Sequence, residues 1–69
     1  MTVFLRDAAT GRFYAGPEKW ESNRSGALAF SSVESAARCG RNQNRARLEV
    51  ILAYDDPICD LVLPLGIGD

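Results

Sequence analysis

A ten-residue segment in the middle of the chain carries the side chains best suited to binding. Residues 38–47 contain four arginines and no acid, interleaved with two asparagines and a glutamine. Guanidinium groups can contact phosphates, and side-chain amides can contact base edges. The segment therefore indicates one function, nucleic-acid binding, with Arg41 and Arg45 among the contacts.

The overall charge argues against that function. The formal net charge is −1, the sequence pI is about 5.2, and residues 48–69 hold five acids and no base. A nucleic-acid module is more often basic overall. A basic loop and an acidic terminal hairpin that neutralise each other explain the same pattern without a ligand.

Groups for catalysis and metal binding are few. The chain has no histidine, which removes the commonest general acid or base. Asp55, Asp56 and Asp60 form the only carboxylate cluster, and their spacing matches no calcium-binding loop. An aspartate before a proline is typical of a turn. We therefore expect no enzymatic activity, no metal and no cofactor.

The two cysteines bear on the compartment. Cys39 and Cys59 lie 20 residues apart without the close pairing of a zinc or redox motif. The sequence contains nothing like a membrane span or signal peptide. We expect reduced thiols in a cytoplasmic protein with no membrane association, and a disulfide between the two cysteines is the alternative.

The element that must organise the rest is the run of residues 48–54. Its alternate residues are apolar on one face, and Ile51 and Ala53 make the other face partly apolar. This pattern predicts an interior strand, because both faces need cover. The face of Ile51 is to be covered either by the loop that carries Trp20 or by a second copy of the chain in a homodimer.

A hairpin precedes this strand. Val3–Arg6 and Arg12–Ala15 are predicted strands, and residues 7–11 supply the aspartate and glycine of a tight turn. Residues 16–26, which open with Gly-Pro, are expected to form an irregular connection. Trp20 either covers the end of the core or serves as an exposed anchor for a partner.

A short helix follows the connection. Ser31 and Glu34 fit a capping box, with Ser31 at the N-cap and Glu34 at the third helical position. The helix is expected to end at Cys39, because Gly40 is a typical residue after a helix. Whether residues 41–47 extend the helix stays open.

The order of these elements predicts the fold. Residues 58–63 read as a final strand, and residues 64–69 as a frayed tail. Residues 1–69 then form a single α+β domain in the order β-β-α-β-β. We expect a four-stranded, mostly antiparallel sheet in the spatial order 2-1-3-4, with the helix packed on one face.

Part of the chain resembles a group of small uncharacterised bacterial proteins. The similarity covers residues 10–37 and rests on turn glycines, packed aromatics and a helix cap: Thr10, Gly11, Arg12, Phe13, Tyr14, Gly16, Pro17, Trp20, Ala27–Phe30, Ser31, Ser32, Ala36 and Ala37. The resemblance implies a β-hairpin followed by a Trp loop and a short helix. It implies no activity.

These patterns together favour a small, non-enzymatic module that binds a protein partner or itself. The domain is small and lacks catalytic groups, and a sheet edge offers a place where a partner strand can add. Nucleic-acid binding through residues 38–47 is the alternative. The expected contact residues are Trp20, Arg41, Arg45 and Ile51.

Overall fold

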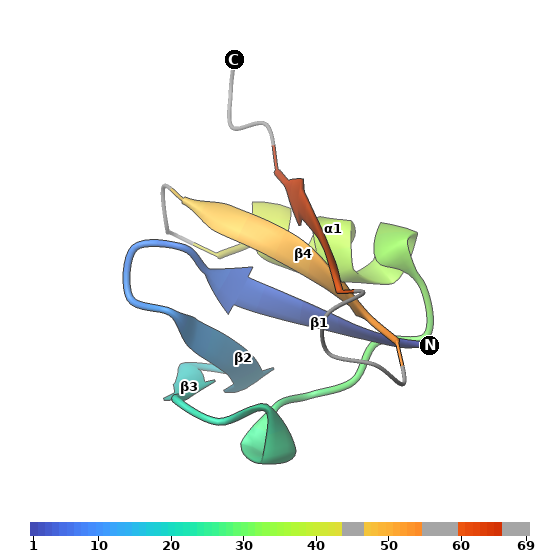
Figure 1. The fold of residues 1–69 in the computed structure, drawn as a ribbon. Helices are drawn as coiled ribbons and strands as arrows, with labels where there is room; N and C mark the ends of the chain where they lie inside the picture. Colours follow the sequence, from blue (N-terminus) through green and yellow to red (C-terminus); the bar gives the residue numbers. More distant parts are fainter. Residues whose placement is uncertain (44–46, 55–59, 66–69) are drawn as a thin grey trace.

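The computed structural model describes residues 1–43, 47–54 and 60–65, and its described part is one antiparallel sheet with a single α-helix (Figure 1). The elements are β1 (Thr2–Asp7), β2 (Arg12–Gly16), β3 (Lys19–Glu21), the 3-10 helix η1 (Arg24–Gly26), α1 (Val33–Arg41), β4 (Leu48–Ala53) and β5 (Leu61–Pro64). The predicted α+β class is confirmed.

The sheet has five described strands in the order β3-β2-β1-β4-β5, all antiparallel. The predicted count of four is wrong, and the order differs by an additional edge strand, β3, within the predicted irregular connection. Pro17 and Glu18, whose φ is 60°, form a tight turn between Gly16 and Lys19. Gly-Pro thus opens a second hairpin here, because proline suits the first central position of a turn.

The interior position of residues 48–53 is confirmed. β4 lies between β1 and β5, and its register with β1 runs from Asp7 opposite Leu48 to Thr2 opposite Ala53. The predicted turn between β1 and β2 is also present. The Asp7 side chain accepts a hydrogen bond from the Ala9 N–H at 2.9 Å, and Gly11 has a φ of 77°.

The helix begins and ends one to two residues later than predicted. Ser32, not Ser31, is the N-cap, since its hydroxyl accepts from the Ser35 N–H at 3.1 Å. Glu34 is therefore not at the capping-box position. Gly40 lies inside the helix and is buried. Because glycine has no side chain, α1 can approach Leu5 and Leu48 closely at this position. Residues 41–47 extend the helix only through Arg41.

One hydrophobic cluster fills the space between the sheet and α1. The helix packs across β1 and β4, and Leu5 at the centre of the contact is 0% exposed. Its other buried members are Val3, Tyr14, Ala36, Leu48, Val50 and Leu52. Leu65 packs against this cluster and donates its N–H to the Leu48 carbonyl at 3.0 Å. Residues 64 and 65 are therefore part of the sheet region and not a frayed tail, while residues 66–69 lie outside the described residues.

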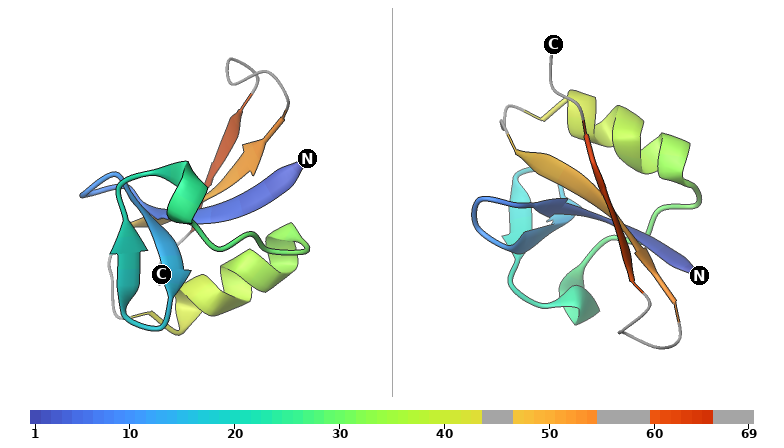
Figure 2. Two further views of the ribbon diagram at one scale, coloured as in Figure 1. Left: turned by 90° about the horizontal axis from the view of Figure 1, so that it is seen from below. Right: turned by 45° about the horizontal axis from the view of Figure 1, so that its top comes forward.

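The opposite face of the sheet carries a second cluster. Phe4, Phe13, Ile51 and Ala53 are buried there, with Ala27 packed against them. Figure 2 shows η1 and α1 on opposite sides of β1. The cover for this cluster thus comes from Ala27 and from Arg24 of η1, at the end of the predicted loop that carries Trp20, so this loop is the alternative that the single chain satisfies. Trp20 lies on the α1 side, edge-on to Tyr14 at 5.4 Å.

Tyr14 is a titratable group whose ionisation opposes folding. Burial raises the pKa of its hydroxyl above the ordinary 10.0, and a hydrogen bond and charge repulsion from Cys39 raise it further. The native state therefore holds this proton more tightly than the unfolded chain, so stability is lost as pH rises above 10.0. We expect Tyr14→Phe to remove this part of the alkaline loss, measured by urea unfolding at neutral and alkaline pH. Tyr54→Phe, at an exposed tyrosine, is the control and should retain the loss.

Candidate functional site

The most exposed apolar surface of the described sheet is its outer strand β5. The side chains of Leu61, Val62 and Leu63 are 50%, 44% and 40% exposed. Leu61 and Leu63 stand opposite Leu52 and Val50, so they point to the α1 side, whereas Val62 stands opposite Ile51 on the other side. Among the described elements, α1 packs over β1 and β4, and β5 packs mainly against β4. We call Leu61–Pro64 the β5 edge.

Among the described strands, the backbone of the β5 edge pairs with β4 alone, on one side. Leu65 donates its N–H inward to Leu48. Because inward and outward groups alternate along an antiparallel strand, the N–H and C=O of Val62 point away from β4, as does the C=O of Pro64. Proline has no N–H to leave unpaired at this position. The β5 edge therefore offers one complete pairing residue, Val62, flanked by exposed leucines.

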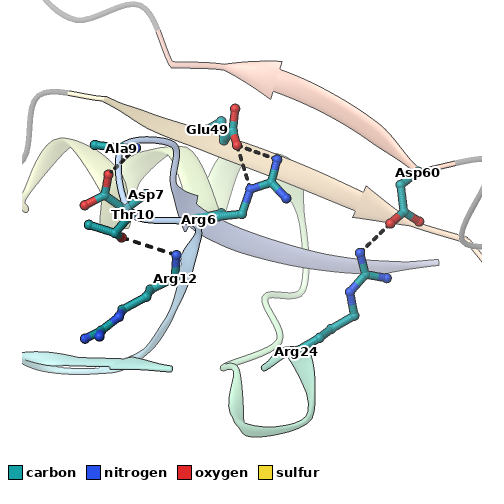
Figure 3. Close-up of polar contacts among 8 residues, drawn as sticks. All are labelled: Arg6, Asp7, Ala9, Thr10, Arg12, Arg24, Glu49 and Asp60. Atoms are coloured by element: carbon teal, nitrogen blue, oxygen red, sulfur yellow. Dashed lines mark hydrogen bonds and ion pairs between the residues drawn. The ribbon is translucent and has the colours of Figure 1, made fainter. Parts of the chain in front are cut away.

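An ion pair fixes the residue before β5. The Arg24 guanidinium contacts the Asp60 carboxylate (Figure 3). The same guanidinium lies over the rings of Phe4 and Phe13, 5.6 and 5.9 Å from their centroids. A cation over an aromatic face is attracted by the ring quadrupole. Arg24 thus links η1 to the start of β5. It also neutralises the acid nearest to the β5 edge.

A second arginine on the same face is paired in a similar way. Arg6 of β1 contacts Glu49 of β4 at 2.5 Å and lies 5.8 Å from the centroid of Phe13. The pair spans two neighbouring strands at a matched register position. Both arginines are therefore paired with an acid and lie over the second hydrophobic cluster.

The four predicted contact residues do not form one site. Trp20 is half-buried against Tyr14, and Ile51 is only 1% exposed, so its side chain offers no surface to a partner. The reason is the cover from Ala27 and from Arg24 of η1, which lies in the loop predicted as one of the two alternatives. Arg41 is exposed at the end of α1. Arg45 lies outside the described residues.

Three exposed arginines do gather at one end of the sheet. The Ala8 N–H donates to the Arg47 carbonyl at 2.7 Å, which places Arg47 beside the turn that leads to Arg12. Arg41 ends the helix whose last turn packs on Leu48. Arg12, Arg41 and Arg47 make no ion pair with another described residue, and we call them the basic end.

Sites for a metal or a redox reaction are not apparent in residues 1–43, 47–54 and 60–65. No group of three or more potential ligands occurs among them. Of the predicted carboxylate cluster, Asp60 is paired with Arg24, and Asp55 and Asp56 lie outside the described residues. Cys39 is a free, half-buried thiol, and Cys59 is not described. The single described helix is too short to cross a membrane.

Comparison with protein-family models, curated proteins and solved structures finds no match to this chain. The function must therefore be argued from the β5 edge and the basic end themselves.

Proposed function

We propose that this protein is a small, non-enzymatic module that binds protein through its β5 edge. The observation that carries the proposal is the exposure of Leu61, Val62 and Leu63, three consecutive apolar residues on an outer strand. Exposed edge strands pair readily with other strands, and proteins usually protect them with charge or cover. The β5 edge carries neither a charge nor a described covering element.

The binding mode that suits this surface is addition of a strand. A partner in extended conformation gains main-chain hydrogen bonds from Val62 and side-chain contacts on both faces of the sheet. Pro64 limits the length of the pairing, because it has no N–H to contribute. We therefore expect a short, specific pairing and not an open-ended one.

Site-specific photocrosslinking tests the proposal. The photoreactive residue p-benzoylphenylalanine replaces Val62 in one variant and Leu28 in its control, since these side chains are 44% and 43% exposed. Irradiation in lysate from the cell of origin should give a protein adduct from position 62 that nuclease treatment does not remove. Equal adducts from both positions, or none from position 62, would contradict binding through the β5 edge.

Nucleic-acid binding is the second candidate, and the clustering of the basic end favours it. Arg12 comes from a part of the chain far from residues 38–47, yet it lies at the same end as Arg47. Guanidiniums gathered in this way can follow a phosphate backbone. Against this candidate stands the net charge of −1.

Fluorescence anisotropy with a labelled single-stranded oligonucleotide tests this candidate. Binding at low salt should weaken as salt is added, with a slope of about 0.7 per phosphate contact in a log–log plot. Replacing Arg12, Arg41 and Arg47 by alanine should abolish binding, while Lys19→Ala, at an exposed residue of β3, should not. Absence of binding by the unmodified chain at low salt would remove this candidate.

A further inference from the structure

We infer that the strand added to the β5 edge is the β5 edge of a second copy of this chain, paired antiparallel about a two-fold axis at Val62. The inference rests on the proposed function and gives its partner. Two sheets of five strands would become one continuous sheet.

The backbone groups of the β5 edge are self-complementary. Val62 presents both its N–H and its C=O outward. With the two-fold axis at this residue, each Val62 exchanges both hydrogen bonds with Val62 of the second copy. Pro64 then stands opposite Asp60 of the second copy, and its carbonyl accepts from that N–H. The missing N–H of Pro64 ends the pairing on each side of the axis.

The side chains match in the same register. Leu61 stands opposite Leu63 of the second copy, and both point to the α1 side. The two-fold axis is perpendicular to the sheet, so the four leucines meet on one face and the two valines on the other. These side chains are 40–50% exposed in the single chain, and the pairing would remove much of that exposure.

The charges permit this arrangement. Leu61–Pro64 carries no charge, and Asp60 is paired with Arg24 of its own chain. Antiparallel pairing places Asp60 opposite Pro64 of the second copy and not opposite another acid. The interface is short, so we expect a weak dimer with a dissociation constant on the order of tens of micromolar.

The other edge of the sheet explains why pairing stops at two copies. β3 has only three residues, and Lys19 and Glu21 are exposed on it. Short, charged edges resist pairing. A β5 edge that paired with β3 of another copy would form an open filament, whereas two β5 edges form a closed dimer.

Sedimentation velocity over a range of micromolar concentrations tests the inference. We expect the unmodified chain to shift from monomer to dimer, and Val62→Lys to weaken association at least about 100-fold, because two lysines would meet at the axis. Leu28→Lys is the control, since Leu28 is equally exposed but lies elsewhere, and it should associate normally. A chain that stays monomeric throughout, or equal loss in both variants, would overturn the inference.

A charge pair at the flanking positions tests the register. Leu61→Lys alone should weaken association about tenfold, and adding Leu63→Glu should restore part of it, since each lysine then meets a glutamate of the second copy. No restoration would overturn the antiparallel register.

If the chain is monomeric but position 62 still crosslinks to a protein of different mass, self-pairing fails while the proposed function stands. If position 62 crosslinks to nothing, both fail.

Discussion

Replacing Leu5 by alanine is expected to remove most of the domain's stability. Leu5 is 0% exposed and lies in β1 at the centre of the cluster beneath α1. Cutting a fully buried leucine back to alanine costs about 2–5 kcal/mol, because a cavity remains where packing is lost. A domain of 69 residues has only about 3–10 kcal/mol in total. We expect the loss for Leu5→Ala to lie near the upper end of the range of about 2–5 kcal/mol, since few neighbours in so small a core can move into the cavity.

Urea unfolding followed by Trp20 fluorescence measures this effect, because Trp20 packs against the same cluster. The midpoint should fall by roughly 4–5 M if the slope is about 1 kcal/mol per molar urea, so a domain at the low end of the stability range would be unfolded without urea. Leu28→Ala, at a position 43% exposed, should change stability by no more than about 0.5 kcal/mol. A loss below about 1 kcal/mol for Leu5→Ala would mean that the helix does not pack on β1 as described.

Replacing Gly40 by valine is expected to have the next largest effect. A Cβ atom at this position would lie 2.5 Å from Leu65 Cδ1 and 3.2 Å from Leu5 Cδ1. Leu65 is half-buried and can move, but Leu5 is held on all sides. The added branched side chain must push α1 away from the sheet, which costs about 2–3 kcal/mol by overpacking.

Two further variants separate this clash from helix propensity. Gly40→Ala gains about 1 kcal/mol of helix propensity, which should nearly offset its smaller clash. Arg38→Val, at an exposed position of α1, reports the propensity cost of valine alone. Thermal unfolding followed by circular dichroism should give the highest midpoint temperatures for wild type and Gly40→Ala. The midpoint of Arg38→Val should be lower, and that of Gly40→Val the lowest. If Gly40→Val matched Arg38→Val, the close approach of α1 would be disproved.

The sequence predicted those elements whose signals are local. The turn between β1 and β2 depends on Asp7 and Gly11, which are suited to it in any context. The interior position of β4 followed from apolar residues on both of its faces, a pattern that only a covered strand can satisfy. The helix followed from a serine cap and an apolar stripe. These predictions needed no knowledge of the rest of the chain.

The errors concern residues whose role depends on distant neighbours. Gly-Pro at 16–17 was assigned to a strand end, but Trp20 packs on Tyr14, and that contact makes a turn and an additional strand favourable. Gly40 resembles a helix terminator, yet the proximity of Leu5 and Leu48 selects glycine inside the helix. Two adjacent serines gave no local reason to choose Ser32 over Ser31 as the cap.

The candidate surface was the least predictable part. Ile51 is among the predicted contact residues, but its face is covered within the chain, by Ala27 and by Arg24 over the rings of Phe4 and Phe13. The exposed β5 edge was missed, although two signals were present. Residues 61–63 are apolar on both faces, and the predicted strand order already placed this strand at an edge. Together these features indicate an open apolar edge.

The position of β1 in the middle of the sheet means that the fold cannot be completed until β4 has been synthesised. β1 is made first, yet its longest neighbour is β4, with Thr2 opposite Ala53. Such high contact order delays folding until both partners are present. A chain cleaved before residue 48 would have the β1–β3 strands and α1 but not β4, so Val3 and Leu5 would lose the neighbours Leu48, Val50 and Leu52 of their cluster. We therefore expect a chain that lacks β4 to aggregate more readily than the full chain.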